Sequence, residues 1–81
     1  MTIRIAAFAR IREIVGHAES QRAVPGAATA GDVWRSLAAE FPALEELRAS
    51  TRMLRNGTLV DAAAALADGD ELALLPPFGG G

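Results

Sequence analysis

The stretch Thr29–Pro42, with the sequence TAGDVWRSLAAEFP, decides how the rest of this chain can fold. Thr29 and Asp32 are spaced as a capping box, in which each side chain accepts a hydrogen bond from the backbone amide of the other residue. Pro42 ends the run, because the residue before a proline avoids the helical conformation. The apolar residues between these two signals lie at helical spacing and are Val33, Trp34, Leu37, Ala38 and Phe41. The stretch is therefore predicted to be an amphipathic helix, with Trp34 and Phe41 as core residues.

Strand patterns precede this helix. Alternating residues predict a strand over 2–8, which is apolar enough on both faces to lie inside a sheet. A short helical turn over 10–15, ended by Gly16, and a second strand over 20–24 follow it.

The sequence after the helix predicts three more strands. A further helical turn over 44–49 comes first, and Asn56-Gly57 then favours a type I′ turn between two short strands. We also expect a helical turn over 62–66, a tight turn at 68–70 and a last strand over 71–75, beside the first. This order predicts an α+β fold, a β-grasp roll in which one main helix covers a mixed sheet of four to five strands.

The composition predicts a single small domain over 1–81. The chain has no cysteine, which excludes disulfides, thiolate metal sites and a cysteine nucleophile. Its net charge of -2 and its scattered arginines argue against nucleic acid, which requires clustered cations. Because arginines interrupt the first apolar residues, we expect no signal peptide, no membrane span and a cytoplasmic location. The chain also has no lysine, so it cannot be joined through a lysine side chain to another copy of itself.

Few residues are candidates for a conventional active site. His17 is the only histidine and has no nucleophile beside it in the sequence, so we interpret it as a solvated loop residue. Asp68, Asp70 and Glu71 could hold a cation, but Asp-Gly-Asp before a strand is ordinary turn chemistry, and we predict no metal site. Phe8 lies on the face of the first strand opposite its isoleucines, which leaves both burial and contact with a partner open.

The C-terminal stretch PPFGGG is the main candidate for a functional segment. It consists of Pro76 and Pro77, then Phe78, then Gly79, Gly80 and Gly81. The prolines would stiffen its base, and the glycines offer only backbone and the terminal carboxylate, a shape that suits a narrow tunnel or pairing with a partner strand. Ordering the glycines costs at least ~1–2 kcal/mol per residue, and Phe78, worth ~1.5–3 kcal/mol if fully buried in a partner, is the candidate anchor that would offset part of this cost. We expect a flexible glycine tail over 76–81, and a frayed end without a role is the alternative.

Three segments occur in an order that is typical of a known family: FARIREIVG at 8–16, NGTLV at 56–60 and DGDELALLPPFGGG at 68–81. Through them the whole chain resembles the ubiquitin-like sulfur carriers of bacteria, and most closely the MoaD family, the small subunit of molybdopterin synthase. Two positions depart from that family's pattern. Phe78 stands where a smaller β-branched residue is common, and Gly79 stands where serine or threonine is common.

The resemblance implies a ubiquitin-like fold in which Gly81 is the reacting group, Gly80 a slim approach and Phe78 a docking anchor. An adenylating enzyme of the E1-like type would use ATP to convert the Gly81 carboxylate to an acyl-adenylate. A sulfur donor, ultimately a cysteine persulfide, would then displace AMP and leave a thiocarboxylate. The tail would enter the large subunit of molybdopterin synthase and give its sulfur to cyclic pyranopterin monophosphate, in a heterotetramer of two small and two large subunits. The large subunit would supply the catalytic side chains, so this chain would hold no permanent cofactor and have little activity alone.

Three other functions remain possible at this point. A sulfur carrier for thiazole synthesis shares the Gly-Gly ending, but such carriers are usually shorter and lack the Phe-Ala opening and the Pro-Pro neck. A ubiquitin-like protein modifier would be found with Gly81 linked to a lysine of another protein. A plain interaction domain would keep its activity after removal of Gly80 and Gly81.

Overall fold

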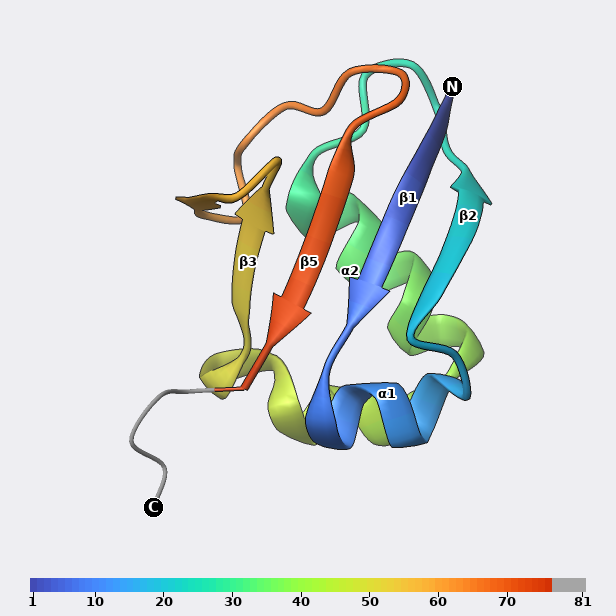
Figure 1. The fold of residues 1–81 in the computed structure, drawn as a ribbon, viewed down its shortest axis with the longest axis vertical. Coiled ribbons are helices and arrows are strands. Elements are labelled where there is room, and N and C mark those ends of the chain that lie inside the picture. The colour runs from blue at the N-terminus through green and yellow to red at the C-terminus, as the bar shows by residue number, and fades with distance from the viewer. Residues whose placement is uncertain (77–81) are drawn as a thin grey trace.

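The computed structural model describes residues 1–76, and its regular elements follow the predicted order (Figure 1). They are β1 (Thr2–Ala7), α1 (Ala9–Val15), β2 (Glu19–Ala23), α2 (Ala30–Glu40), the 3-10 helix η1 (Pro42–Ser50), β3 (Arg52–Arg55), β4 (Thr58–Val60) and β5 (Glu71–Leu75). The predicted first, second and last strands are confirmed to within one residue at each end. The helical turn predicted over 44–49 is part of η1.

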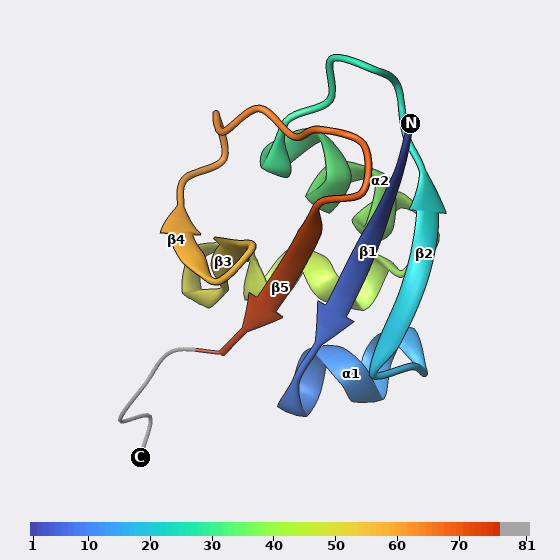
Figure 2. The same cartoon turned by 45° about the horizontal axis from the view of Figure 1, so that its top comes forward.

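The five strands form one mixed sheet in the order β2-β1-β5-β3-β4. β1 and β5 run parallel, with Ile5 opposite Leu72, and the other neighbouring strands are antiparallel. The prediction that the first and last strands lie side by side is therefore confirmed. The helix α2 lies behind one face of the sheet in both views (Figures 1 and 2), and we call the opposite face the open face. This is the predicted β-grasp roll.

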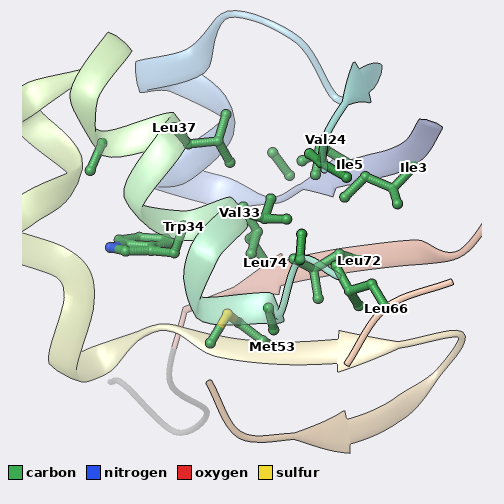
Figure 3. Close-up of a cluster of buried hydrophobic side chains, with 14 of the residues drawn as sticks. Ile3, Ile5, Val24, Val33, Trp34, Leu37, Met53, Leu66, Leu72 and Leu74 are labelled. Carbon is green, nitrogen blue, oxygen red and sulfur yellow. The ribbon is translucent and has the colours of Figure 1, made fainter. Parts of the chain in front are cut away.

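The hydrophobic core lies between α2 and the sheet (Figure 3). Its largest fully buried side chains are Ile3, Ile11, Val33, Trp34, Leu44, Leu72 and Leu74. Trp34 is confirmed as a core residue. Phe41 follows the last residue of α2 and is half-buried against the core, so the prediction for this residue holds in part.

The start of α2 has the predicted capping box. The Thr29 hydroxyl oxygen accepts a hydrogen bond from the Asp32 amide at 3.1 Å, and the Asp32 carboxylate accepts one from the Thr29 amide at 2.9 Å. The first amides of a helix have no acceptor within the helix, and the box satisfies one of them locally.

The helical turn predicted over 62–66 is wrong. This segment is irregular and lies against the first turn of α2, where the Ala30 amide donates to the Ala64 carbonyl and the Gly31 amide to the Ala62 carbonyl, both at 2.9 Å. The carbonyls of this segment therefore satisfy amides of α2 that have no helical partner. That need arises from a distant part of the chain, so the alanine-rich local sequence does not reveal it.

Two turns show the backbone conformation that their residues predict. Asn56 and Gly57 have φ values of 49° and 86°, and positive φ at both positions is the type I′ geometry predicted for the hairpin of β3 and β4. Gly16 ends α1 with φ of 87°. None of the helices within residues 1–76 is long and apolar enough to cross a membrane.

Candidate functional site

The candidate site is built on β5, which neighbouring strands hold on both sides. β1 pairs with it in parallel and β3 antiparallel, and its residues Leu72 and Leu74 are fully buried. The strand ends at Leu75, and the half-buried Pro76 follows it. Of the predicted tail residues, Pro77, Phe78, Gly79, Gly80 and Gly81 lie outside the described residues. The base of the predicted tail is thus attached to a strand that cannot shift without disturbing the core.

Phe8 lies beside the carboxyl end of β5. Its amide donates a hydrogen bond to the Leu74 carbonyl at 3.3 Å, and its backbone is extended. Ala9, the next residue, has φ of 51°, a left-handed conformation that is uncommon for residues other than glycine, and it turns the chain from β1 into α1. The Phe8 side chain remains 46% exposed. The structure therefore favours contact with a partner over burial for this residue.

The open face carries further apolar side chains near Phe8. The strand register places Leu54 between Ala73 on β5 and Leu59 on β4, and it places Ala73 next to Ala6 on β1. The two alanines are shielded by their neighbours, whereas Leu59 is 60% exposed. We define the apolar patch as Phe8, Leu54, Leu59 and Leu75. Exposed apolar side chains on one face of a sheet are candidates for contact with a partner.

The sequence analysis missed Leu54 and Leu59 as candidate interface residues. Successive side chains of a strand point to opposite faces, so the burial of Met53 in the core sends Leu54 to the open face. The alternation itself is visible in the sequence. Which of its two faces the helix covers is visible only in the structure.

The acidic residues of the turn before β5 act in that turn, as predicted. An Asp68 oxygen accepts a hydrogen bond from the Thr2 amide at 2.7 Å, and the Asp70 carboxylate accepts from the Ala67 amide at 2.8 Å and from the Asn56 side chain at 2.9 Å. These hydrogen bonds, that of the Ala67 amide first, hold the pKa of Asp70 below its usual value. Within residues 1–76, no group of histidine and acidic side chains is arranged to hold a metal ion.

The remaining charged candidates are at the surface. A carboxylate oxygen of Glu71 lies 3.9 Å from a guanidinium nitrogen of Arg4 on the open face. An exposed ion pair of this kind contributes little stability. His17 is exposed in the loop between α1 and β2. This agrees with its interpretation as a solvated loop residue.

A family model described as the ThiS family matches residues 5–81, which is nearly the whole chain. The chain belongs to the ThiS family. This is the ThiS/MoaD family of sulfur carriers, and two kinds of named relative occur at similar identity.

One relative is the small archaeal modifier protein 1 of Haloferax volcanii, which is 40% identical over 82 residues that cover 91% of this chain and 94% of the relative. Another is the molybdopterin synthase sulfur carrier subunit of Arabidopsis thaliana, which is 33% identical over 79 residues that cover 98% of this chain and 82% of the relative.

Two solved structures resemble this ThiS-family protein over the whole of both chains. The crystal structure of the Haloferax volcanii modifier has a TM-score of 0.85 at 36% identity. A chain in the complex of subunits 1 and 2 of the molybdopterin-converting factor from Helicobacter pylori has a TM-score of 0.71 at 24% identity, which establishes the shared fold alone. These likenesses and the sheet order confirm the ubiquitin-like β-grasp fold.

Proposed function

We propose that this ThiS-family protein is the sulfur carrier subunit of molybdopterin synthase, with the Gly81 carboxylate as the sulfur-bearing group. The observation that carries the proposal is the position of β5. This central strand, buried at Leu72 and Leu74, leads directly into Pro76 and the glycine-ending segment, and the apolar patch lies beside that point. A carrier needs such a combination of a fixed base, a backbone-only reactive end and a docking surface.

The loading chemistry begins with activation of Gly81, because a free carboxylate is a poor electrophile. An adenylating enzyme of the E1-like type joins the carboxylate to the AMP portion of ATP and releases pyrophosphate. The outer sulfur of a cysteine persulfide attacks the acyl carbon, AMP leaves, and an acyl disulfide forms. A second thiol cleaves this disulfide by thiol–disulfide exchange, which leaves the Gly81 thiocarboxylate and a new disulfide on the donor.

The transfer takes place in the large subunit. The thiocarboxylate sulfur attacks a side-chain carbon of cyclic pyranopterin monophosphate and displaces the oxygen bound there, which leaves as water or, at the cyclic phosphate ester, stays on the phosphate. Hydrolysis of the resulting thioester regenerates the Gly81 carboxylate and leaves the sulfur on the pterin. Two transfers supply the two sulfurs of the dithiolene. The large subunit provides the catalytic side chains, so the isolated carrier holds no permanent cofactor and has little activity of its own.

The partners follow from this cycle. They are the large subunit, in an assembly of two small and two large subunits, the adenylating enzyme and a persulfide donor, all in the cytoplasm. The name of the Arabidopsis relative supports the large subunit as a partner. Burial of Phe78 in the large subunit would offset the ordering of Gly79 and Gly80, and the apolar patch would contact the same partner.

The thiocarboxylate is the product to test for. The purified protein would be incubated with soluble extract of its host, ATP and cysteine, treated with a thiol alkylating reagent and analysed by intact mass and by the mass of its C-terminal peptide. The chain has no cysteine, so a thiol reagent can mark only a thiocarboxylate. We expect one label within 76–81, and none on a variant that lacks Gly80 and Gly81.

The pathway is tested in a second step. For this step the thiocarboxylate form is prepared without the alkylating reagent. It is then mixed with the large subunit and cyclic pyranopterin monophosphate. Formation of molybdopterin supports the proposal. A thiocarboxylate that forms but yields no molybdopterin overturns the assignment to this pathway, and an unlabelled tail in an extract that loads a known carrier overturns the sulfur-carrier role itself.

A second function, covalent protein modification, is favoured by the name of the Haloferax relative, a small archaeal modifier. The same adenylate of Gly81 would then be attacked by a lysine amine of another protein, with AMP as the leaving group and an isopeptide bond as the product. Because the chain has no lysine, its conjugates would not grow into lysine-linked chains of this protein.

Modification has its own signature in mass spectrometry. Trypsin would leave the whole segment 56–81 on the target lysine, because Arg55 is the last basic residue. Chymotrypsin, which cleaves after aromatic residues, would leave the glycines after Phe78 as a short remnant. Such remnants on lysines of the host proteome, lost when Gly81 is deleted, would establish modification, and their absence from a culture that yields the thiocarboxylate would leave sulfur transfer as the function.

A further inference from the structure

Asn56 is the only asparagine of the chain, and Gly57 follows it in the turn between β3 and β4. An asparagine side chain reacts with the backbone of its own chain most readily when glycine comes next, because glycine has no Cβ to hinder the approach. Both residues are exposed, and a Cβ built on Gly57 would meet no heavy atom within 4 Å. The pair that forms the turn is therefore also a place where the chain can be modified without an enzyme.

The reaction is the loss of the side-chain amide of Asn56. The backbone nitrogen of Gly57 attacks the Cγ of Asn56, and the bond between Cγ and Nδ2 breaks. Ammonia leaves with the proton that the Gly57 amide gives up, and a five-membered succinimide ring remains. Water then opens the ring at either of its carbonyls, which yields aspartate or isoaspartate at this position. Water is the only other reactant, and the exposed turn is in contact with it.

The fold restrains the Asn56 side chain at the start of β5, which lies beside the tip of the hairpin (Figure 1). The Nδ2 group donates a hydrogen bond to the Asp70 carboxylate at 2.9 Å, and Oδ1 accepts one from the Glu71 amide at 2.9 Å. The Asn56 amide also donates to the Glu71 carbonyl at 2.9 Å. Because Nδ2 departs as ammonia, ring closure has to break the hydrogen bond to Asp70. The reaction therefore requires local opening of the hairpin from β5.

The product does not fit the contacts that Asn56 makes. An ionised aspartate has two acceptor oxygens and no donor. One oxygen can accept from the Glu71 amide, but the other then faces the Asp70 carboxylate, so two like charges replace a charge-assisted hydrogen bond. The nearby cation Arg55 is already engaged, since it donates to the Ala65 carbonyl at 2.7 Å. Isoaspartate adds a backbone methylene as well, which changes the length of the two-residue turn.

We propose that Asn56 is a site of spontaneous deamidation, that its hydrogen bonds to Asp70 and Glu71 slow this reaction, and that the product releases the hairpin tip from β5. Leu54 and Leu59 of the apolar patch lie on the two strands of this hairpin. Deamidation would therefore alter the open face and limit the lifetime of the native surface. The inference concerns the folded domain and does not depend on sulfur transfer.

The reaction is measured on the purified full-length protein, incubated in neutral buffer. Deamidation adds one negative charge, so ion-exchange chromatography separates the product, and peptide masses locate the change. Gln21 is the only other side-chain amide in the chain, which leaves the assignment simple. Enzymatic methylation that is specific for isoaspartate distinguishes the two products. We expect the folded protein to lose the amide of Asn56, and the same chain unfolded in urea to lose it about tenfold faster or more.

A matched pair of variants tests the restraint. Asp70→Ala removes the acceptor of the Asn56 Nδ2 group. Asp68→Ala also removes an acceptor from the turn before β5, but that acceptor binds the Thr2 amide at 2.7 Å instead. We expect Asp70→Ala to deamidate about tenfold faster than the natural chain, which corresponds to loss of a hydrogen bond to a charged group. Asp68→Ala should deamidate at the natural rate.

A second pair of variants tests the effect of the product. Asn56→Asp introduces the product directly, whereas Asn56→Gly removes the same side-chain hydrogen bonds without adding a charge and keeps a favoured type I′ turn. We expect amide hydrogen exchange in β3 and β4 to be fastest in Asn56→Asp, with β1 and β2 unchanged. Exchange in Asn56→Gly should be closer to that of the natural chain.

Three results would overturn the proposal. If the folded protein keeps the Asn56 amide while the unfolded chain loses it, Asn56 is not a modification site of the native protein. Equal rates in folded and unfolded protein, or in Asp70→Ala and Asp68→Ala, would show that the hydrogen bond to Asp70 does not restrain the reaction. If β3 and β4 exchange at the natural rate in Asn56→Asp, the product leaves the hairpin in place. None of these measurements involves the thiocarboxylate, so they succeed or fail independently of the sulfur-carrier role.

Discussion

Leu59 offers the sharpest test of the apolar patch, because most of its side chain is still available to a partner. Full burial of a leucine is worth about 1.5–3 kcal/mol, and Leu59 is 60% exposed in the free protein. Burial of the exposed part in a complex would therefore contribute roughly 1–2 kcal/mol. We expect Leu59→Ala to weaken binding to the large subunit by about 5- to 30-fold.

The same substitution should have a small effect on folding. The part of Leu59 that is already covered accounts for roughly 0.5–1 kcal/mol of the free energy of unfolding. Ile3→Val is the matched control, since Ile3 is completely buried and is not part of the apolar patch, and its loss of one methylene costs about 0.5–1.5 kcal/mol. The two variants should be similarly destabilised, and Leu59→Ala alone should bind weakly.

Calorimetric titration of the purified large subunit with each variant measures the affinity. Urea denaturation, followed by the fluorescence of the single tryptophan Trp34 in the core, measures stability. If Leu59→Ala binds like the natural chain, the apolar patch is not the docking surface for this partner. If Ile3→Val loses as much affinity as Leu59→Ala, the effect comes from stability rather than from contact.

Three further predictions concern the fold. Gly31→Ala would place a Cβ 3.0 Å from the 62–66 segment, and strain of ~1–3 kcal/mol should exceed the gain of about 1 kcal/mol from removing a helix glycine. The urea midpoint of unfolding should therefore fall for Gly31→Ala. It should stay nearly constant for the control Gly26→Ala, whose Cβ would meet open space. Equal midpoints for the two variants would contradict the close contact at Gly31. Thr29→Ala should lower the free energy of unfolding by about 0.5–2 kcal/mol through loss of the helix cap. Thr29→Ser keeps the hydroxyl and should regain most of this stability. If Thr29→Ser is as unstable as Thr29→Ala, the loss comes from packing of the methyl group instead. Because the pKa of Asp70 is lowered in the folded state, its charged form stabilises the fold above the unfolded pKa of 3.8. This stabilisation is lost as the pH falls through the lower folded pKa. The free energy of unfolding of Asp70→Asn should therefore be below that of the natural chain at about pH 6 and approach it at about pH 2. A difference that is constant over this range would refute the electrostatic origin.

Some parts of the molecule could be predicted because their determinants are local. The capping box of Thr29 and Asp32, the Asn56-Gly57 turn and the last strand were all predicted, since each rests on conformational preferences of adjacent residues. The segment 62–66 was predicted wrongly because its conformation depends on amides at the start of α2, which are distant in sequence.

The candidate functional site shows the same difference between local and distant determinants. The residues of the tail were recognisable from the sequence, because three glycines after two prolines are a local pattern, and Pro76 is the one of them that the structure describes. The apolar patch was not, because it assembles Phe8, which follows β1, with side chains from β3, β4 and β5, and the order of these strands in the sheet is β1-β5-β3-β4. Phe8 was a candidate in the sequence, but its choice between core and surface depended on the turn at Ala9.

The sequence by itself therefore predicted most of the elements, their order and Gly81 as the candidate reacting group, because these predictions depend on residue type and spacing along the chain. The tertiary structure decided which face of each strand α2 covers, and hence that Leu59 and Phe8 remain exposed while Leu72 and Trp34 are buried. It also decided which strands form the two edges of the sheet. The physical reason is that burial and strand pairing are relations between segments that are far apart in sequence, and they exist only once the chain has closed around its core.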